Sequence, residues 1–189
     1  QAVVIGARFL RRTSLAERAR PILRKLMHDT GETANLGSEQ NGRVLFLSQV
    51  ETHETIRAFF PPGTLSPMHS SGIGKALLAQ MDEDRLNRTL SAHALEAFTE
   101  HTITDVSALK SDLAEIRARG FSMDGEEKNL GMRCIAAPVF DMNSEAIAGL
   151  SVSGPTSRVG QAQINAFSAA VIKAADELTR AIGGVPPVR

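Results

Sequence analysis

The stretch "MRCIAAPVFDMNSEAIAGLSVS", residues 132–153, contains the pattern that decides the fold class. Its two apolar runs, 132–140 and 146–153, are separated by the segment "DMNSE" at 141–145, which is polar except for Met142. Apolar runs of this length that are bounded by turn-forming residues are typical of β-strands, and so short a connection joins antiparallel neighbours. The stretch therefore predicts a β-hairpin.

The register of this hairpin determines which of its side chains share a face. With "DMNS" as the four-residue turn, pairing backward places Cys134 opposite Ser151 and Met132 opposite Ser153. Side chains alternate across a strand, so these four are expected on one face of the sheet. The apolar residues expected on the other face are Ile135, Leu150 and Val152. A buried hydroxyl without a partner costs about 1–3 kcal/mol, so the serines indicate either bonds to backbone carbonyls or a polar wall facing a ligand.

Further strands are predicted on the N-terminal side of this hairpin. The region 33–58 has strand-like composition, and Asn41-Gly42 within it is a strong signal for a tight hairpin turn. "FFPPGTLSP" at 59–67 reads as a loop, and "FSMD" at 121–124 as a short strand. Two hairpins and an edge strand, flanked by helices, predict an α+β domain with a largely antiparallel sheet.

Helices are predicted from caps and from the spacing of apolar residues. Ser14 and Glu17 form a capping-box pattern, so the first helix is expected to begin at Ser14. Pro21 is expected to kink or restart that helix, because proline has no N–H to donate. The other helices are predicted over 82–90, 105–119 and 164–182.

Composition excludes several classes of protein. Lys and Arg total 21 and Asp and Glu total 21, so the chain lacks the basic footprint of a nucleic-acid-binding surface. The single cysteine rules out an internal disulfide and a multi-cysteine zinc site, and it fits a reducing cytoplasm. No apolar stretch reaches the roughly 18 residues of a membrane span. We therefore expect a cytoplasmic protein with no metal, no cofactor and no membrane contact.

A glycine-rich turn, "MHSSGIGKALLAQ" at 68–80, precedes a short apolar helix. It is not a nucleotide-binding loop, because Ala76 stands where such loops carry Ser or Thr after the lysine, and Lys75 is expected to be solvated. The free N–H groups over 71–74 favour a small anion at the helix start. The alternative is structural: Ser70 or Ser71 caps the helix, and the glycines pack against the sheet.

Four segments together resemble the C-terminal effector-binding domain of the IclR family of bacterial transcriptional regulators. They are "LAERARPILRKLMHDTGET", "MHSSGIGKALLAQ", "GMRCIAAPVFD" and "GLSVSGPTSR". The resemblance covers nearly the whole chain and is strongest to the glyoxylate- and pyruvate-sensing repressors. It implies a GAF/PAS-like fold: a curved antiparallel sheet, helices on both sides, and a ligand pocket against one face.

The resemblance also implies a domain organisation. Family members carry a winged helix-turn-helix that binds operator DNA ahead of this domain, and they form dimers that associate into tetramers. Residue 1 is Gln, so the natural start is expected upstream. We expect 1–13 to be a connector from that DNA-binding domain, 14–185 to be the effector-binding domain, and 186–189 to be a tail.

The small-acid pocket of the glyoxylate-sensing members is carried over by the resemblance as a set of positions. Its polar positions fall on the backbone of Gly72 and Ile73 and on Asp124, Cys134, Ser151 and Ser153, and its apolar wall falls on Met132 and Ser66. Two positions depart from the family pattern: Ser66 stands where those members have leucine, and Ile73 where they have alanine. The resemblance therefore leaves the identity of the acid open.

The expected function is that of a sensor and not of an enzyme. A 2-oxo or 2-hydroxy acid would place its carboxylate on the amides over 71–74 and accept hydrogen bonds from Ser151 and Ser153. Asp124 would have to be protonated, or accept from a hydroxyl of the ligand. Three alternatives remain: a sensor of a larger or aromatic acid, a thiol-dependent enzyme that uses Cys134 with His69, and a purely structural oligomerisation module.

Overall fold

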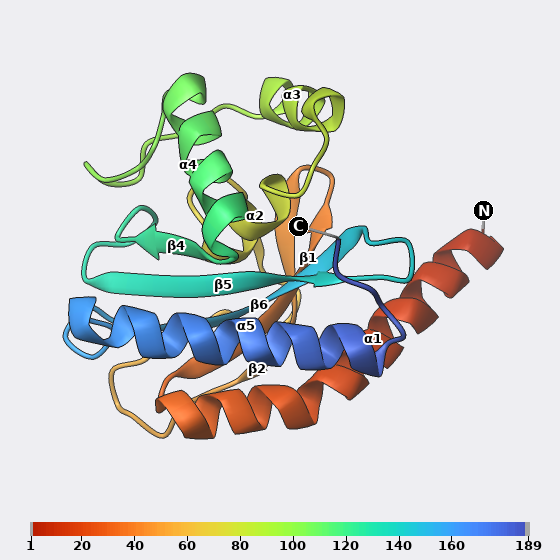
Figure 1. Cartoon of the computed structure of the whole chain (residues 1–189), viewed down its shortest axis with the longest axis horizontal. Coiled ribbons are helices and arrows are strands. Elements are labelled where there is room, and N and C mark those ends of the chain that lie inside the picture. Colours follow the sequence, from red (N-terminus) through yellow and green to blue (C-terminus); the bar gives the residue numbers. More distant parts are fainter. Residues whose placement is uncertain (1, 188–189) are drawn as a thin grey trace.

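The protein, in a computed structural model, is a single six-stranded antiparallel sheet with helices on both faces (Figure 1). The structure describes the backbone of residues 2–187 and the side chains of residues 14–187. The order of the strands across the sheet is β3-β2-β1-β6-β5-β4. The strands are β1 (Thr33–Gln40), β2 (Arg43–Val50), β3 (Leu65–Pro67), β4 (Ser122–Gly125), β5 (Met132–Phe140) and β6 (Ala146–Pro155). The predicted α+β class, with a curved antiparallel sheet, is confirmed.

The helices form two layers. Helices α1 and α5 cover one face of the sheet, and α2 and α4 lie on the other, with α3 beyond α2 (Figure 1). Their bounds are α1 (Ala2–Thr30), α2 (Gly72–Leu78), α3 (Glu83–Ala92), α4 (Val106–Arg119) and α5 (Ile164–Ala181), with a 3-10 turn η1 (Gln161–Gln163) before α5. No helix in the described part of the chain is long and apolar enough to cross a membrane.

The first hairpin forms as the sequence predicts. Asn41 and Gly42 both have positive φ, 52° and 72°, and this left-handed pair matches the twist of the strands that it joins. The carboxylate of Glu39 accepts a hydrogen bond from the Gly42 N–H at 2.7 Å, which fixes the turn. The predicted strand region was too long, however, because β2 ends at Val50, and a short strand, β3, lies within the predicted loop.

The second hairpin is confirmed, but its predicted register is wrong by two residues. Cys134 pairs with Ser153 and Ser151 with Ala136, while Met132 pairs with Pro155. The cause is the turn: the Asp141 N–H donates to the Glu145 carbonyl at 2.9 Å, and the register shifts between Val139 and Phe140. A slip of one residue would have reversed the faces, but a slip of two preserves them.

The two faces of the sheet therefore differ in chemistry as predicted. Leu150 and Val152 are fully buried against α1 and α5, together with Ile135 of β5. The alternate residues of β6, Ser151 and Ser153, face the α2 side, where the pairing of β1 with β6 places Asn35 beside Ser151. One face is an ordinary apolar core, and the other carries polar groups in its middle.

The predicted start of the first helix is wrong. Helix α1 begins at Ala2 and runs through Ser14 and Pro21 without a restart. Ser14, Glu17 and Pro21 all lie on its exposed side, whereas Leu15 and Ala19 are buried. A serine and a glutamate three residues apart look alike at a helix start and on a solvated helical face, so the pattern alone did not locate the start. That 1–13 is a connector remains a prediction.

The other helix boundaries agree with their caps. The Asp82 and Asp105 carboxylates accept hydrogen bonds from Arg85 N at 2.7 Å and Ala108 N at 2.8 Å, respectively. Gly120 ends α4 with a φ of 83°, the left-handed conformation that glycine adopts without strain.

One edge of the sheet, near the second hairpin, is protected from pairing with a further strand. Strand β4 pairs with β5 only as far as Ala136, so 137–140 has no neighbouring strand on that side. Pro138 has no N–H to offer there. The N–H of Phe140 donates to Thr179 Oγ1 of α5 at 3.1 Å, and the N–H of Val185 donates to the Asp141 carbonyl at 3.0 Å.

Candidate functional site

The start of α2 is capped by the residue before it. Ser71 Oγ accepts a hydrogen bond from the Gly74 N–H at 3.2 Å, and the Ser71 carbonyl accepts from the Lys75 N–H at 2.8 Å. The capping alternative is thus confirmed, with Ser71 and not Ser70 as the cap. Within the turn, Gly72 lies against Cys134 of β5.

The two glycines of the turn allow α2 to lie directly on the sheet. A Cβ on Gly72 would lie 2.7 Å from Cys134 Sγ, and one on Gly74 would lie 2.2 Å from the Met68 carbonyl oxygen. Both distances are shorter than any real contact, so only glycine fits. Ser122 of β4 donates a hydrogen bond to the Gly72 carbonyl at 2.6 Å and holds the turn against β4.

A polar cluster lies on the sheet beneath this turn. Ser151 and Ser153 are 1% and 3% exposed, and Asn35 Nδ2 donates to their hydroxyl oxygens at 3.3 and 3.4 Å. Gln49 Nε2 in turn donates to Asn35 Oδ1 at 3.1 Å. Sequence reasoning missed Asn35, which shares the face of the serines only because β1 pairs with β6, a pairing between strands more than 100 residues apart.

Cys134 lies where the turn and the polar cluster meet. Burial, and then the nearby Asp124 carboxyl, raise the pKa of its thiol to about 11, against the opposing effect of hydrogen bonding from Ser153, Ser151 and the Gly72 N–H. The group is therefore a neutral thiol at physiological pH and not a nucleophile. Among the described residues, no hydrogen bond joins His69 to this thiol; His69 Nε2 is instead bonded to the Glu96 carbonyl at 2.9 Å.

Asp124 is opposite Cys134 in the pairing of β4 with β5. Its Oδ1 accepts hydrogen bonds from the N–H groups of Glu127 at 2.7 Å and Lys128 at 3.4 Å, so it also shapes the turn after β4. Burial, and then the charge of Glu127, raise the pKa of Asp124 to about 7. The two N–H bonds and Lys75 oppose the shift. At neutral pH, this carboxyl is close to half protonated.

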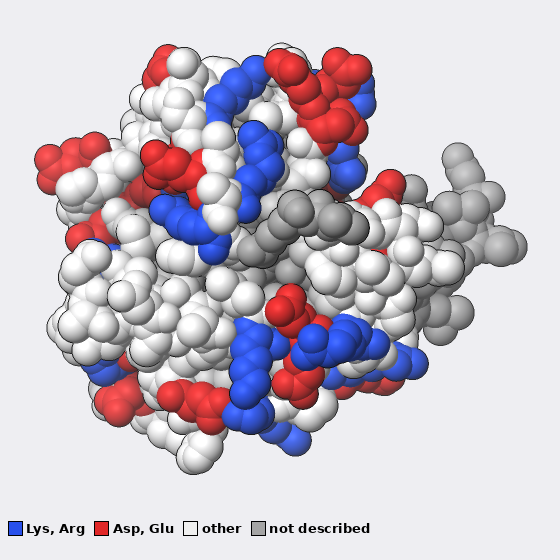
Figure 2. Space-filling view, viewed as in Figure 1, with Lys and Arg blue, Asp and Glu red and all other residues white. Residues whose placement is uncertain are grey.

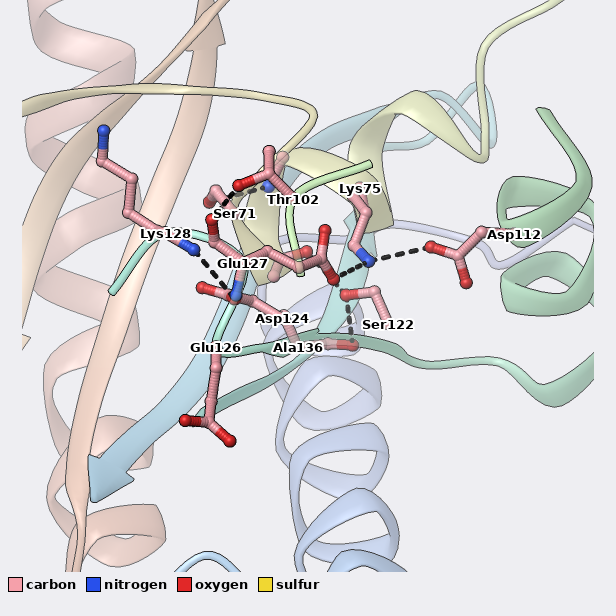
Figure 3. A network of polar contacts seen from close by, with 12 residues as sticks. Ser71, Lys75, Thr102, Asp112, Ser122, Asp124, Glu126, Glu127, Lys128 and Ala136 are labelled. Carbon is pink, nitrogen blue, oxygen red and sulfur yellow. Dashed lines mark hydrogen bonds and ion pairs between the residues drawn. The ribbon is translucent and has the colours of Figure 1, made fainter. Parts of the chain in front are cut away.

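A buried ion cluster adjoins the site (Figure 3). Lys75 Nζ lies 2.8 Å from Asp112 of α4 and 2.5 Å from Glu127, and the Lys75 side chain is 2% exposed. The expectation of a solvated lysine was wrong: Lys75 is on the buried side of a helix whose seven residues are all buried. Burial raises the pKa of Glu127, and Lys75 acts against that rise.

The remaining predicted residues occupy different places. Ile73 is 1% exposed and fills the space over Gly37 and Gly149, where an added Cβ would lie 3.3 and 3.0 Å from its side chain. Met132 is partly exposed at the start of β5. Ser66 lies on β3, and strands β2 and β1 stand between it and β6. The structure thus brings Gly72, Cys134, Asp124, Ser151 and Ser153 together and places Ser66 apart.

Two recesses are present elsewhere in the described chain. One, of about 200 Å³, lies among Met68, His69 and His93. The other, of about 470 Å³, lies between α4 and α5 and reaches Pro186 and Pro187. Neither is lined by Ser151 or Ser153. At the margin of the polar cluster, Cys134, Asp124 and Met132 are partly exposed.

Comparison with known proteins assigns the chain to a family. Residues 7–180 match the family model described as "Bacterial transcriptional regulator IclR C-terminal". The chain is 61% identical over 174 residues to the HTH-type transcriptional regulator BhcR of Paracoccus denitrificans. This alignment covers 92% of this chain and 62% of BhcR. It is 41% identical over 186 residues to the transcriptional repressor IclR of Escherichia coli, covering 97% of this chain and 68% of that repressor.

Solved structures agree with this assignment. The crystal structure of the Thermotoga maritima IclR superposes with a TM-score of 0.88 at 31% identity, over 96% of this chain and 74% of that one. The C-terminal domain of the E. coli regulator KdgR superposes with a TM-score of 0.82 at 33% identity, over 89% of this chain and 98% of that one. These relatives are named as regulators and not as enzymes, which contradicts the thiol-enzyme alternative. The chain belongs to the IclR family of bacterial transcriptional regulators and corresponds to the C-terminal, GAF/PAS-like domain of its members.

Proposed function

We propose that this chain is the sensor domain of a transcriptional regulator and that it binds a small carboxylic acid, a 2-oxo or 2-hydroxy acid such as glyoxylate or pyruvate. The observation that carries the proposal is the convergence of hydrogen-bond donors on one spot. Gly72 lies directly over Cys134 Sγ at the start of α2, Ser153 is opposite Cys134 in the pairing of β5 with β6, and Ser151 is the next residue of β6 on the same face. A neutral thiol is a weak acceptor, so these donors remain suited to an anion.

The neighbouring groups favour a short acid. Ile73 and the close contact of Gly72 with Cys134 leave little room between α2 and the sheet. An acid of a few atoms would enter beside Asp124 and Met132, which are partly exposed. With a pKa of about 7, Asp124 can donate to the acid when protonated, or accept from a ligand hydroxyl when ionised.

A larger or aromatic acid remains the alternative ligand. The position that favours it is Ser66, which is smaller than the leucine expected there and is 6% exposed on β3. Its distance in the sheet order from the serines of β6 makes it the weaker candidate.

We propose further that the acid controls operator-DNA binding by a part of the protein outside this chain, through rearrangement of a dimer or tetramer. The chain spans 62% of the length of BhcR and 68% of that of the E. coli IclR repressor, which leaves room for such a part. Figure 2 shows Lys and Arg interspersed with Asp and Glu on the face viewed, and the charges of the chain sum to zero. Such a surface does not favour DNA by itself.

The test is calorimetric titration of the chain with glyoxylate, pyruvate, lactate and benzoate. We expect saturable binding of at least one short acid, without its consumption, and loss of that binding in the double variant Ser151→Ala/Ser153→Ala. The exposed Ser111→Ala is the matched control and should bind as the wild type does. Binding of benzoate alone would favour the larger-acid alternative. If none of these acids binds, the sensor proposal is wrong and a structural module becomes the better reading.

A further inference from the structure

Asn35 lies between the polar cluster and the outer part of the sheet. It is fully buried on β1, and its side chain makes three hydrogen bonds: one from Gln49 of β2 and two to the serines of β6. In the structure, this amide accepts from Gln49 and donates to both serines, and that orientation has consequences for the serines.

The direction of each bond follows from the chemistry of the groups. The Gln49 Nε2 group can only donate, so the atom of Asn35 that faces it is the carbonyl oxygen, at 3.1 Å. The Nδ2 group of Asn35 therefore faces the serines, and it too can only donate. Both serine oxygens act as acceptors toward Asn35, at 3.3 and 3.4 Å.

Each serine then has one hydroxyl hydrogen that Asn35 does not use. This hydrogen is available to the side where Cys134 and the α2 turn lie, since Cys134 is opposite Ser153 in the pairing of β5 with β6. All hydrogen bonds in this network run in the same direction. Gln49 donates to Asn35, Asn35 donates to the serines, and the serines can donate to a ligand beside the thiol.

We propose that Asn35 is a specificity-determining positioning residue, which makes Ser151 and Ser153 hydrogen-bond donors toward the ligand and so restricts the site to anionic acceptors. The inference rests on the proposed function, because it concerns the same site. The inference goes beyond the proposed function because it assigns the preference for an anion to Asn35 on β1 and Gln49 on β2, and not to the serines alone.

Two variants reverse the donor–acceptor direction of the hydrogen bonds to the serines in different ways. Asn35→Asp keeps the shape of the side chain and the acceptor for Gln49, but it offers only acceptors to the serines, whose hydrogens then turn toward β1. Gln49→Glu replaces the donor that faces Asn35 by an acceptor, so the Asn35 amide should rotate and present its oxygen to the serines. Gln49 is half-buried, which makes this second change tolerable to the fold. The exposed Gln161→Glu carries the same change of charge and is the matched control.

The measurement is the ratio of the affinities for pyruvate and for its neutral amide, pyruvamide, by calorimetry on the folded chain. We expect both reversing variants to lower this ratio at least tenfold, which corresponds to about 1.4 kcal/mol, and Gln161→Glu to leave it unchanged. Thermal melting of each variant confirms that the folded protein is being titrated. If Asn35→Asp does not fold, Gln49→Glu alone decides.

The possible failures are distinct. A wild type that binds no acid overturns the proposed function and this inference with it. A wild type that binds pyruvate, with reversing variants whose affinity ratio is unchanged, overturns the inference alone. Equal loss of both ligands in the variants also overturns it, because a purely structural role of Asn35 weakens binding without regard to charge.

Discussion

Asp124 joins two roles in one side chain, as a turn-forming acceptor and as a titrating group beside the polar cluster. Its Oδ1 is bonded to two backbone N–H groups, which favours the carboxylate, while burial and the nearby Glu127 favour the acid. The groups that face it are Glu127, Lys75, Lys128 and Cys134. Burial has the largest effect on the pKa, so the charge of this carboxyl changes near neutral pH.

Asp124 should make the stability of the domain depend on pH. Its pKa is raised from 3.8 to about 7 in the folded state. The folded form therefore holds a proton that the unfolded form has lost, so its stabilising contribution is complete below about pH 4 and disappears as the pH rises through about 7. Asp124→Asn keeps the acceptor for the Glu127 N–H and has no proton to lose.

Urea denaturation of both proteins from about pH 5 to about pH 8 measures this effect. We expect the free energy of unfolding of the wild type to fall relative to that of Asp124→Asn across this range. A difference between the two proteins that stays constant with pH would show that Asp124 is ionised throughout.

Among the elements, the contact of α2 with β5 depends on Gly72. A methyl group there would lie 2.7 Å from Cys134 Sγ, so Gly72→Ala should destabilise the fold by about 1–3 kcal/mol through overpacking. Cys134→Ala removes the sulfur, so the double variant should recover much of that loss, and a double-mutant cycle measures the coupling.

Gly125→Ala is the control for this cycle, because its Cβ would meet only Met123 Cε at an ordinary 3.7 Å. Additive effects of Gly72→Ala and Cys134→Ala would mean that the helix start does not rest on the thiol.

Elements whose signals are local were predictable from the sequence. The Asn41-Gly42 turn and the helix starts at Asp82 and Asp105 each depend on a few adjacent residues, and all three are confirmed. The face of Ser151 and Ser153 was also predicted correctly, because alternation survives a register error of two. The register error came from the shift in pairing between Val139 and Phe140, which depends on the hydrogen bonds within the turn.

Features that depend on distant parts of the chain were not predictable. Asn35 meets the serines through a strand pairing that no local pattern encodes, and Lys75 is buried only because α4 and the turn after β4 supply its partners. A solvated face and a buried ion pair use the same residue types, so composition does not separate them.

In the whole molecule, Lys75 holds three parts of the α2 side together. It joins α2 to Asp112 of α4 and to Glu127 in the turn after β4. Lys75→Met leaves the Glu127 carboxylate, 8% exposed, without its cation, whereas Asp112 keeps Arg119 at 3.7 Å, and it should destabilise the domain by about 3–5 kcal/mol.

Lys110→Met provides the comparison for this prediction. Lys110 pairs with Glu83 at 3.9 Å on the surface, where an ion pair contributes about 0–1 kcal/mol. Chemical denaturation of both variants measures the two effects. A loss in Lys75→Met no larger than that in Lys110→Met would mean that water, and not the lysine, balances the carboxylates.

The closed margin of the sheet beside β5 constrains how copies of this chain can meet. A bare strand would offer a ladder of main-chain groups to any neighbour, and extended chains add to such ladders without regard to sequence. Pro138, the Thr179 hydroxyl and the segment at Val185 remove that ladder over 137–140. Along 137–140, a strand of another molecule therefore cannot extend the sheet. Any contact between copies at this edge would depend on the shape and chemistry of side chains.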